Sequence, residues 1–226
     1  MHRNNGPSEL TIGAGEAALA ALWTVPASAT GTVVFAHGSG SSRFSMRNQF
    51  VARTLQQAGF ATLLLDLLTP EEEEYDRRTD MLRFDVAFLA QRLEAAIAWC
   101  ATQADVKHLR LGLFGASTGA AAALIAAARL PSHVHAVVSR GGRVDMAASV
   151  LPQVQAPALC IVGGADRQVL ELNLAAAKSL RAEHDVIVIA GASHLFEEPG
   201  ALERVAELAR DWFVTYLAPA GQRLEH

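Results

Sequence analysis

At residues 115–119 the sequence reads GASTG, directly after the apolar residues 109–114 and directly before an alanine-rich stretch that ends ahead of Pro131. This pattern is typical of a serine held on a sharp turn between a strand and a helix. Small neighbours are needed because the turn crowds the backbone and strains the serine. The stretch therefore predicts an α/β fold with Ser117 as a candidate nucleophile, and a helix-capping serine is the alternative.

Strand-like and helix-like stretches alternate along the chain around this turn. Runs rich in Val, Leu and Ile, typical of strands covered on both faces, occupy residues 19–25, 32–37, 61–66, 109–114, 135–139, 158–162 and 185–189, with a weaker one at 9–12. Helical spacing fits residues 47–57, 83–101, 117–128, 170–182 and 200–216. The alternation predicts a doubly wound, mostly parallel sheet of about eight strands with helices on both faces. The first two strand candidates have no helix between them, so we expect an antiparallel hairpin or meander at the sheet edge.

The most charged segment lies at residues 71–78, where four glutamates are followed by Tyr75, Asp76 and two arginines. A solvated loop is the simplest interpretation. A mobile flap near the site is the alternative, because the segment follows the C-terminal end of a strand, where open α/β sheets bind ligands.

The composition indicates a compact globular protein, with 51% apolar and 19% charged residues among 226. We expect one α/β domain over residues 1–223, and we interpret residues 224–226 as an expression-tag remnant. The formal net charge is −4 and no block of Lys and Arg stands out, so a nucleic-acid partner is not expected. No apolar run is long enough to span a membrane and no secretory signal is evident.

Two cysteines, Cys100 and Cys160, lie in apolar surroundings. Such placement favours buried free thiols and a reducing, cytoplasmic compartment, although the sequence leaves a disulfide between them open.

A serine hydroxyl needs a base to accept its proton. His194 lies just after the last predicted strand, at the same sheet edge as Ser117, and we expect it to be that base. His37 also ends a strand at this edge, but it begins a His-Gly turn. The other histidines are terminal or precede strands at the opposite edge: His2, His108, His133, His135, His184 and His226.

A carboxylate at the same edge must orient the base. Asp166 directly follows the strand at 158–162 and is the favoured acid, with helix capping as its alternative role. Asp145, after the strand ending near Ser139, is the rival. The resulting order of Ser117, Asp166 and His194 is the order of α/β-hydrolases.

Acyl transfer also needs backbone N–H groups that stabilise an oxyanion. We expect these from Thr118, which follows the nucleophile, and from Ser39 in the loop after residues 32–37. His37 is interpreted as a hydrogen-bonding brace of that glycine-rich loop, which includes Gly38. Further pocket candidates that could hold a substrate carboxylate are Arg43 and Arg140, for which an exposed or ion-paired structural role is the simpler interpretation.

Taken together, these stretches resemble the α/β-hydrolase superfamily, and within it the small dienelactone-hydrolase-like group. The resemblance covers about residues 32–216 and rests on VVFAHG at 33–38, GASTG at 115–119, GGAD at 163–166 and GASH at 191–194. Dienelactone hydrolases use a cysteine nucleophile, whereas residue 117 is serine, which favours ordinary carboxylic esters. Larger relatives insert a helical lid between the positions of residues 139 and 158, and this chain has no room for one.

The expected function is a carboxylesterase for small, accessible esters that works through an acyl-enzyme. A thioesterase, a lactonase or dienelactone hydrolase, and an acyl-amidase are alternatives on the same triad. A non-catalytic α/β-hydrolase scaffold is the alternative from a different class. No metal or cofactor is expected, the partner is a small-molecule ester, and a homodimer is left open.

Overall fold

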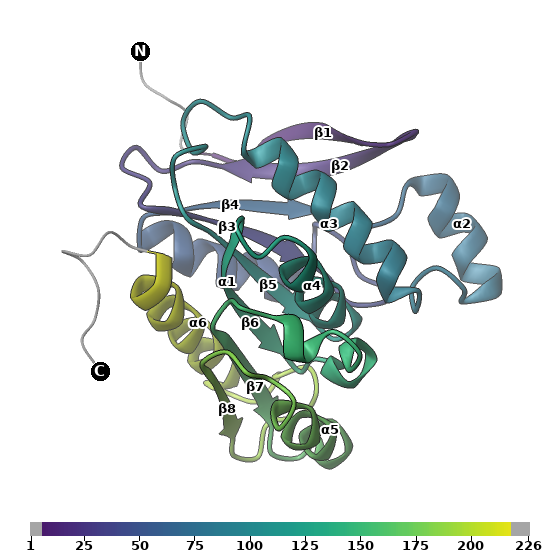
Figure 1. The fold of residues 1–226 in the computed structure, drawn as a ribbon, viewed down its shortest axis with the longest axis vertical. Coiled ribbons are helices and arrows are strands. Elements are labelled where there is room, and N and C mark those ends of the chain that lie inside the picture. Colours follow the sequence, from purple (N-terminus) through teal and green to yellow (C-terminus); the bar gives the residue numbers. More distant parts are fainter. Residues whose placement is uncertain (1–5, 218–226) are drawn as a thin grey trace.

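The computed structural model describes residues 6–217, so the expected tag remnant at residues 224–226 lies outside the described residues (Figure 1). Eight strands form one sheet in the order β1-β2-β4-β3-β5-β6-β7-β8. Their bounds are β1 Ser8–Ala14, β2 Ala17–Thr24, β3 Gly31–Ala36, β4 Phe60–Leu65, β5 Leu111–Ala116, β6 Val134–Arg140, β7 Ala158–Gly163 and β8 His184–Ile189. All pairs from β4 to β8 are parallel, which is the predicted α/β-hydrolase fold.

The N-terminal edge of the sheet is antiparallel. The hairpin at this edge is formed by β1 and β2, and β2 pairs with β4 and not with β3. The expected hairpin between the strand candidates at 19–25 and 32–37 was therefore wrong, because β3 lies inside the sheet between β4 and β5. This position brings the loop after β3 next to the turn after β5.

Helices cover both faces of the sheet. α1 (Met46–Gln57) and α6 (Ala201–Leu217) share one apolar core with the sheet, whereas α3 (Val86–Cys100), α4 (Thr118–Arg129) and α5 (Arg167–Ala177) pack on the other face. Figure 1 shows α3 and α4 side by side across that face. Only two short 3-10 turns, Val144–Ala147 and Leu151–Gln153, connect β6 to β7, so no lid domain is present within residues 6–217.

Both cysteines are free and buried. Burial raises the pKa of each thiol to about 12, so neither is a ready nucleophile. None of the helices within residues 6–217 is long and apolar enough to cross a membrane.

The charged segment after β4 is a helix, and the prediction of a solvated loop there was wrong. α2 spans Pro70–Thr79. Thr69 Oγ1 accepts a hydrogen bond from the Glu72 amide (3.2 Å), and Glu72 in turn accepts one from the Thr69 amide (2.8 Å), which is a capping box. Pro70 stands at the first helical position, glutamates fill the first turn and arginines the last, so the helix dipole is matched at both ends.

α2 is attached to the rest of the molecule by ion pairs. Arg92 of α3 donates to Glu72, and Arg83 donates to Asp76. Asp76 is the one buried residue of α2, and its carboxylate accepts hydrogen bonds from the Leu82 amide (2.7 Å), the Arg83 amide (3.1 Å) and Arg83 Nε (2.5 Å). These bonds offset the cost of burying the carboxylate and keep the pKa of Asp76 below its ordinary value.

We expect Asp76→Asn to loosen α2 and to destabilise the protein by about 2–3 kcal/mol at neutral pH, because the amide keeps one acceptor oxygen and turns an N–H donor toward other donors. The folded pKa is depressed, so the stabilisation is complete above the ordinary value of 3.8 and is lost as the pH falls through the folded pKa. Urea unfolding and amide hydrogen exchange over a pH series measure both effects. Asp80→Asn is the matched control, since Asp80 pairs with Arg83 at the exposed surface (3.2 Å) and should matter little. An equal loss in both variants would contradict the role given to Asp76.

Candidate active site

Ser117 sits on a strained turn between β5 and α4. Its backbone angles are φ 52° and ψ −122°, in a region that residues other than glycine rarely adopt. The Ser117 amide donates to the Arg140 carbonyl (3.2 Å), and the Ser117 carbonyl accepts from the Arg143 amide (3.1 Å). Hydrogen bonds to the end of β6 and to the loop after it therefore hold the turn in place. Ser117 occupies the N-cap position of α4 but its side chain makes no capping bond. The hydroxyl is therefore not used by the helix.

The glycines of the GASTG stretch are required by close backbone contacts. A Cβ on Gly115 would lie 2.4 Å from Ala120 Cα, and a Cβ on Gly119 would lie 2.4 Å from the Ala36 and His37 carbonyl oxygens. The start of α4 is thus pressed against β5 and against the end of β3. Only glycine fits at either position.

His194 and Asp166 are in direct contact. Asp166 follows β7 and occupies the N-cap position of α5, but its carboxylate makes no capping bond. Instead, His194 Nδ1 lies 2.6 Å from Asp166 Oδ2. A histidine that donates from Nδ1 to a carboxylate presents Nε2 as a proton acceptor.

The rival carboxylate is engaged elsewhere. Asp145 receives two hydrogen bonds from the Arg143 guanidinium, from Nε (2.9 Å) and Nη2 (2.8 Å). These bonds lower the pKa of Asp145. Among the described residues, the carboxylate that contacts His194 is Asp166.

Gly141 links the serine turn to the histidine. It follows Arg140, whose carbonyl accepts the Ser117 amide, and a Cβ on Gly141 would lie 3.4 Å from both His194 Nδ1 and Cε1. The imidazole therefore lies over the end of β6, one strand away from Ser117. The two candidate residues share the carboxyl edge of the sheet, as the sequence predicted.

The loop after β3 lies directly against the serine. A Cβ on Gly38 would be 2.9 Å from Ser117 Cβ. Ser39 and Thr118 line the same small cavity of about 30 Å³, together with side chains of α2. Thr118 is the first residue of α4, where the backbone N–H has no partner inside the helix. The expected oxyanion donors are thus brought together beside Ser117.

His37 braces this loop. Its Nδ1 lies 2.8 Å from the Gly38 carbonyl oxygen, and its Nε2 accepts a hydrogen bond from the Leu67 amide (3.0 Å). This pattern requires the neutral ring with the proton on Nδ1. Burial lowers the pKa of His37, which keeps the ring neutral. His37 therefore ties the loop after β3 to the loop after β4.

The two arginines named as pocket candidates differ in their environment. Arg43 is ion-paired: its guanidinium and its amide both donate to Asp66, and the guanidinium stacks 4.1 Å from the Phe44 ring centre. Arg140 is buried, and its Nη1 has no hydrogen-bond partner within residues 6–217.

Two supporting residues escaped the sequence analysis. Asn173 of α5 is fully buried and donates from Nδ2 to the Gly142 carbonyl (2.8 Å), which fixes the segment beside His194. Glu198 accepts from the Ser193 amide (3.0 Å), and this bond lowers the pKa of Glu198. An asparagine on the apolar face of a predicted helix was a usable signal for Asn173. Nothing in the sequence marked Glu198.

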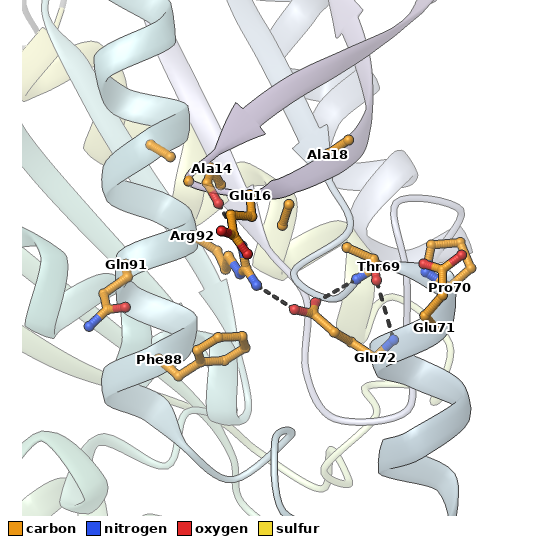
Figure 2. A pocket seen from close by; sticks show the side chains of 13 residues that line it. Ala14, Glu16, Ala18, Thr69, Pro70, Glu71, Glu72, Phe88, Gln91 and Arg92 are labelled. Atoms are coloured by element: carbon orange, nitrogen blue, oxygen red, sulfur yellow. Dashed lines mark hydrogen bonds and ion pairs between the residues drawn. The ribbon is translucent and has the colours of Figure 1, made fainter.

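A larger hollow lies away from these residues. A groove of about 880 Å³ opens between the β1–β2 turn, the start of α2 and α3. Figure 2 shows Arg92 and Thr69 both bonded to Glu72 at its centre. None of the site residues predicted from the sequence lines this groove. Within residues 6–217 there is also no cluster of three or more His, Cys, Asp or Glu side chains that could hold a metal ion.

Sequence comparison identifies a family. The model of the Dienelactone hydrolase family matches residues 19–217. A Mycobacterium tuberculosis protein named "Putative phosphoribosyl transferase" is 54% identical over 213 residues, which cover 94% of this chain and 47% of that protein. The chain thus spans about half the length of the curated relatives that it matches most extensively.

Solved structures share the fold. The crystal structure of a dienelactone hydrolase from Anabaena variabilis is 55% identical, with a TM-score of 0.91, and the match covers 93% of this chain and 99% of that one. Est1E from Butyrivibrio proteoclasticus is 15% identical with a TM-score of 0.77 over 91% of this chain and 97% of its own, a likeness of fold alone.

Proposed function

The chain belongs to the dienelactone hydrolase family, and we propose that it is a serine hydrolase that cleaves small carboxylic esters through an acyl-enzyme. The observation that carries this proposal is the 2.6 Å contact between His194 Nδ1 and Asp166 Oδ2 at the edge where the strained Ser117 ends β5. Neither Ser117 nor Asp166 caps its helix, although both stand at N-cap positions. Neither side chain is therefore used by its helix.

In the proposed mechanism, Ser117 Oγ attacks the ester carbonyl carbon while His194 Nε2 takes its proton. Asp166 stabilises the imidazolium that forms. The amides of Ser39 and Thr118 donate to the oxyanion, and the tetrahedral intermediate collapses as His194 protonates the leaving alkoxide. Water then attacks the acyl-enzyme through the same base and restores Ser117.

The surroundings of Ser117 favour small substrates. The cavity beside Ser39 and Thr118 has about 30 Å³, far below the volume that usually encloses a drug-sized ligand. No lid domain covers this edge within residues 6–217. Lactones, thioesters and activated amides are chemically close alternatives for the same residues.

The transferase name of the Mycobacterium tuberculosis relative belongs to a protein of which this chain covers 47%. Because the match leaves more than half of that protein uncovered, the transferase name supports no transferase proposal for this chain.

We also propose a cytoplasmic location and, for residues 6–217, a single-domain organisation, supported by the two buried free thiols and by the single sheet.

Fluorophosphonate labelling tests the mechanism directly. In wild-type protein, Ser117 Oγ should displace fluoride from the reagent, so that the protein gains one phosphonyl group, detected by intact mass, and Ser117→Ala should gain none. Ser41→Ala is a matched control, because Ser41 lines the small cavity beside Ser39 and Thr118 but has no assigned chemical role, and it should label like wild type. Folded wild-type protein that fails to label would refute the serine mechanism.

A chain-length series tests the substrate class. We expect kcat/KM for p-nitrophenyl esters to be highest for acetate to butyrate and to fall by roughly tenfold or more at octanoate and beyond, because no enclosed pocket desolvates a longer chain. Initial rates below the critical micelle concentration give the comparison. A preference for long chains would contradict the assignment to small esters.

A further inference from the structure

Thr118 carries a buried hydroxyl without a hydrogen-bond partner. The residue is 2% exposed, and its Oγ1 has no partner within residues 6–217. Threonines on three other helices donate from Oγ1 to the carbonyl oxygen four residues earlier, over 2.9 to 3.3 Å: Thr54, Thr79 and Thr215. Thr118 is the first residue of α4, so the residue four positions before it belongs to β5 and offers no helical carbonyl. Its own helix therefore cannot satisfy this hydroxyl.

Thr118 lines the small cavity beside the loop after β3. The cavity has about 30 Å³, close to the volume of one water molecule in the liquid, so it admits a single small polar group. Other hydroxyl side chains that line it are Ser39, Ser41 and Ser42. Among the buried side-chain atoms that lack a partner in the described part of the chain, Thr118 Oγ1 is the one carried by a residue of this lining. A buried hydroxyl left unpaired is costly, and a ligand with a polar group in this cavity would pair it.

The position of Thr118 relates this hydroxyl to one atom of the substrate. Thr118 follows Ser117 directly, and its amide is a proposed donor to the ester carbonyl oxygen. Gly38, which lines the same cavity, lies so close to the nucleophile that a Cβ on it would be 2.9 Å from Ser117 Cβ. As many covalent bonds separate the Thr118 amide nitrogen from Oγ1 as separate an ester carbonyl oxygen from an oxygen on C2 of the acyl group. The amide and the hydroxyl can therefore hold these two substrate oxygens side by side.

Resting on the proposed esterase function, we propose that Thr118 Oγ1 is a specificity-determining group that hydrogen-bonds a hydroxyl on C2 of the acyl group. The substrate class is then the small 2-hydroxy esters. A hydroxyl both donates and accepts, so a substrate hydroxyl can pair with Thr118 Oγ1 in either direction. A site built to bond a hydroxyl discriminates against the analogue that lacks it, because its own polar group is then left unpaired.

Methyl glycolate and methyl propanoate test this role, because they differ only in a hydroxyl that replaces the terminal methyl group of the acyl chain. Hydrolysis is followed by pH-stat, and the glycolate-to-propanoate ratio of kcat/KM is compared between variants, so that the different intrinsic reactivities of the two esters cancel. Thr118→Val replaces the hydroxyl with a methyl group and should lower this ratio about 3- to 10-fold. Thr118→Ser keeps a hydroxyl and should retain most of the ratio.

Thr32→Val is the matched control. Thr32 is 1% exposed and its Oγ1 also lacks a partner within residues 6–217, but it lies near the start of β3, at the opposite edge of the sheet from Ser117. This variant should keep the wild-type ratio. A purely structural role for the Thr118 hydroxyl would lower the rates on both esters together in Thr118→Val, and leave the ratio unchanged. Thr118→Ala gives the same comparison if the valine variant does not fold.

The outcomes separate this role from the proposed function. Wild type that labels with fluorophosphonate, but whose ratio is unchanged in Thr118→Val, overturns the role of the hydroxyl and leaves the esterase. Protein that neither labels nor hydrolyses any ester overturns the esterase. In that case the Tm is measured with glycolamide and with propanamide at equal concentration. A larger rise with glycolamide in wild type, absent in Thr118→Val, supports the hydroxyl site, and equal rises with the two amides in wild type overturn it.

Discussion

Replacing Ser117 with glycine is expected to abolish ester hydrolysis and to make the protein more stable. Removing the hydroxyl takes away the proposed nucleophile, which should lower kcat by roughly 10⁴- to 10⁶-fold. The same change relieves a backbone held at φ 52° and ψ −122°, a strain of about 1–3 kcal/mol. Glycine also loses more conformational entropy on folding, which lowers the stability by about 0.5–1 kcal/mol. The net increase in the free energy of unfolding is therefore about 1 kcal/mol.

Ser117→Ala separates the two effects. Alanine lacks the hydroxyl but keeps the Cβ, so it should be as inactive as glycine without the gain in stability. No capping bond is lost in either variant, because the Ser117 side chain makes none. Urea unfolding of the three proteins gives the comparison. If the glycine variant is no more stable than the alanine variant, the turn is not strained in the way described.

The second large effect is expected for Asp166→Asn, which should lower kcat by roughly 10³- to 10⁴-fold while the fold stays intact. The amide can turn its NH₂ group toward His194 Nδ1, which favours the ring with its proton on Nε2 and removes the proton acceptor. Asparagine has nearly the same shape as aspartate and can occupy the same place beside His194, so KM should change little.

Asp145→Asn is the natural comparison, because Asp145 was the rival acid and has its carboxylate bound by Arg143. It should keep kcat within a few-fold of wild type. Steady-state kinetics on p-nitrophenyl acetate, with circular dichroism to verify folding, decides between the two. A large loss in Asp145→Asn with little loss in Asp166→Asn would reverse the assignment of the acid.

The sheet was predictable because its strands are continuous apolar runs covered on both faces, and such runs are hard to mistake. The alternation of strands and helices also predicts which loops meet at the carboxyl edge, so Ser117 and His194 could be placed at the same edge from the sequence. The sequence favoured Asp166 but left Asp145 open, since both follow strands that end at this edge. The two carboxylates differ in their contacts, because Asp166 lies against His194 and Asp145 is bound by the Arg143 guanidinium, and such contacts cannot be predicted from strand order.

Other features depended on signals that were overlooked or absent. α2 was mistaken for a loop because its charge obscured a capping pattern at Thr69, Pro70 and Glu72. The sequence could not show that Arg140 Nη1 lacks a hydrogen-bond partner within residues 6–217, because such a lack depends on how the side chains pack.

The way α2 is attached makes it the natural place to redesign the molecule. Neither apolar core includes a residue of α2, so its substitutions leave the packing of the sheet untouched. Yet α2 supplies Glu73 and Asp76 to the cavity beside Ser39 and Thr118. A library that varies the outward residues of α2 and keeps Glu72 and Asp76 as anchors would therefore search new substrate preferences while the catalytic edge keeps its geometry.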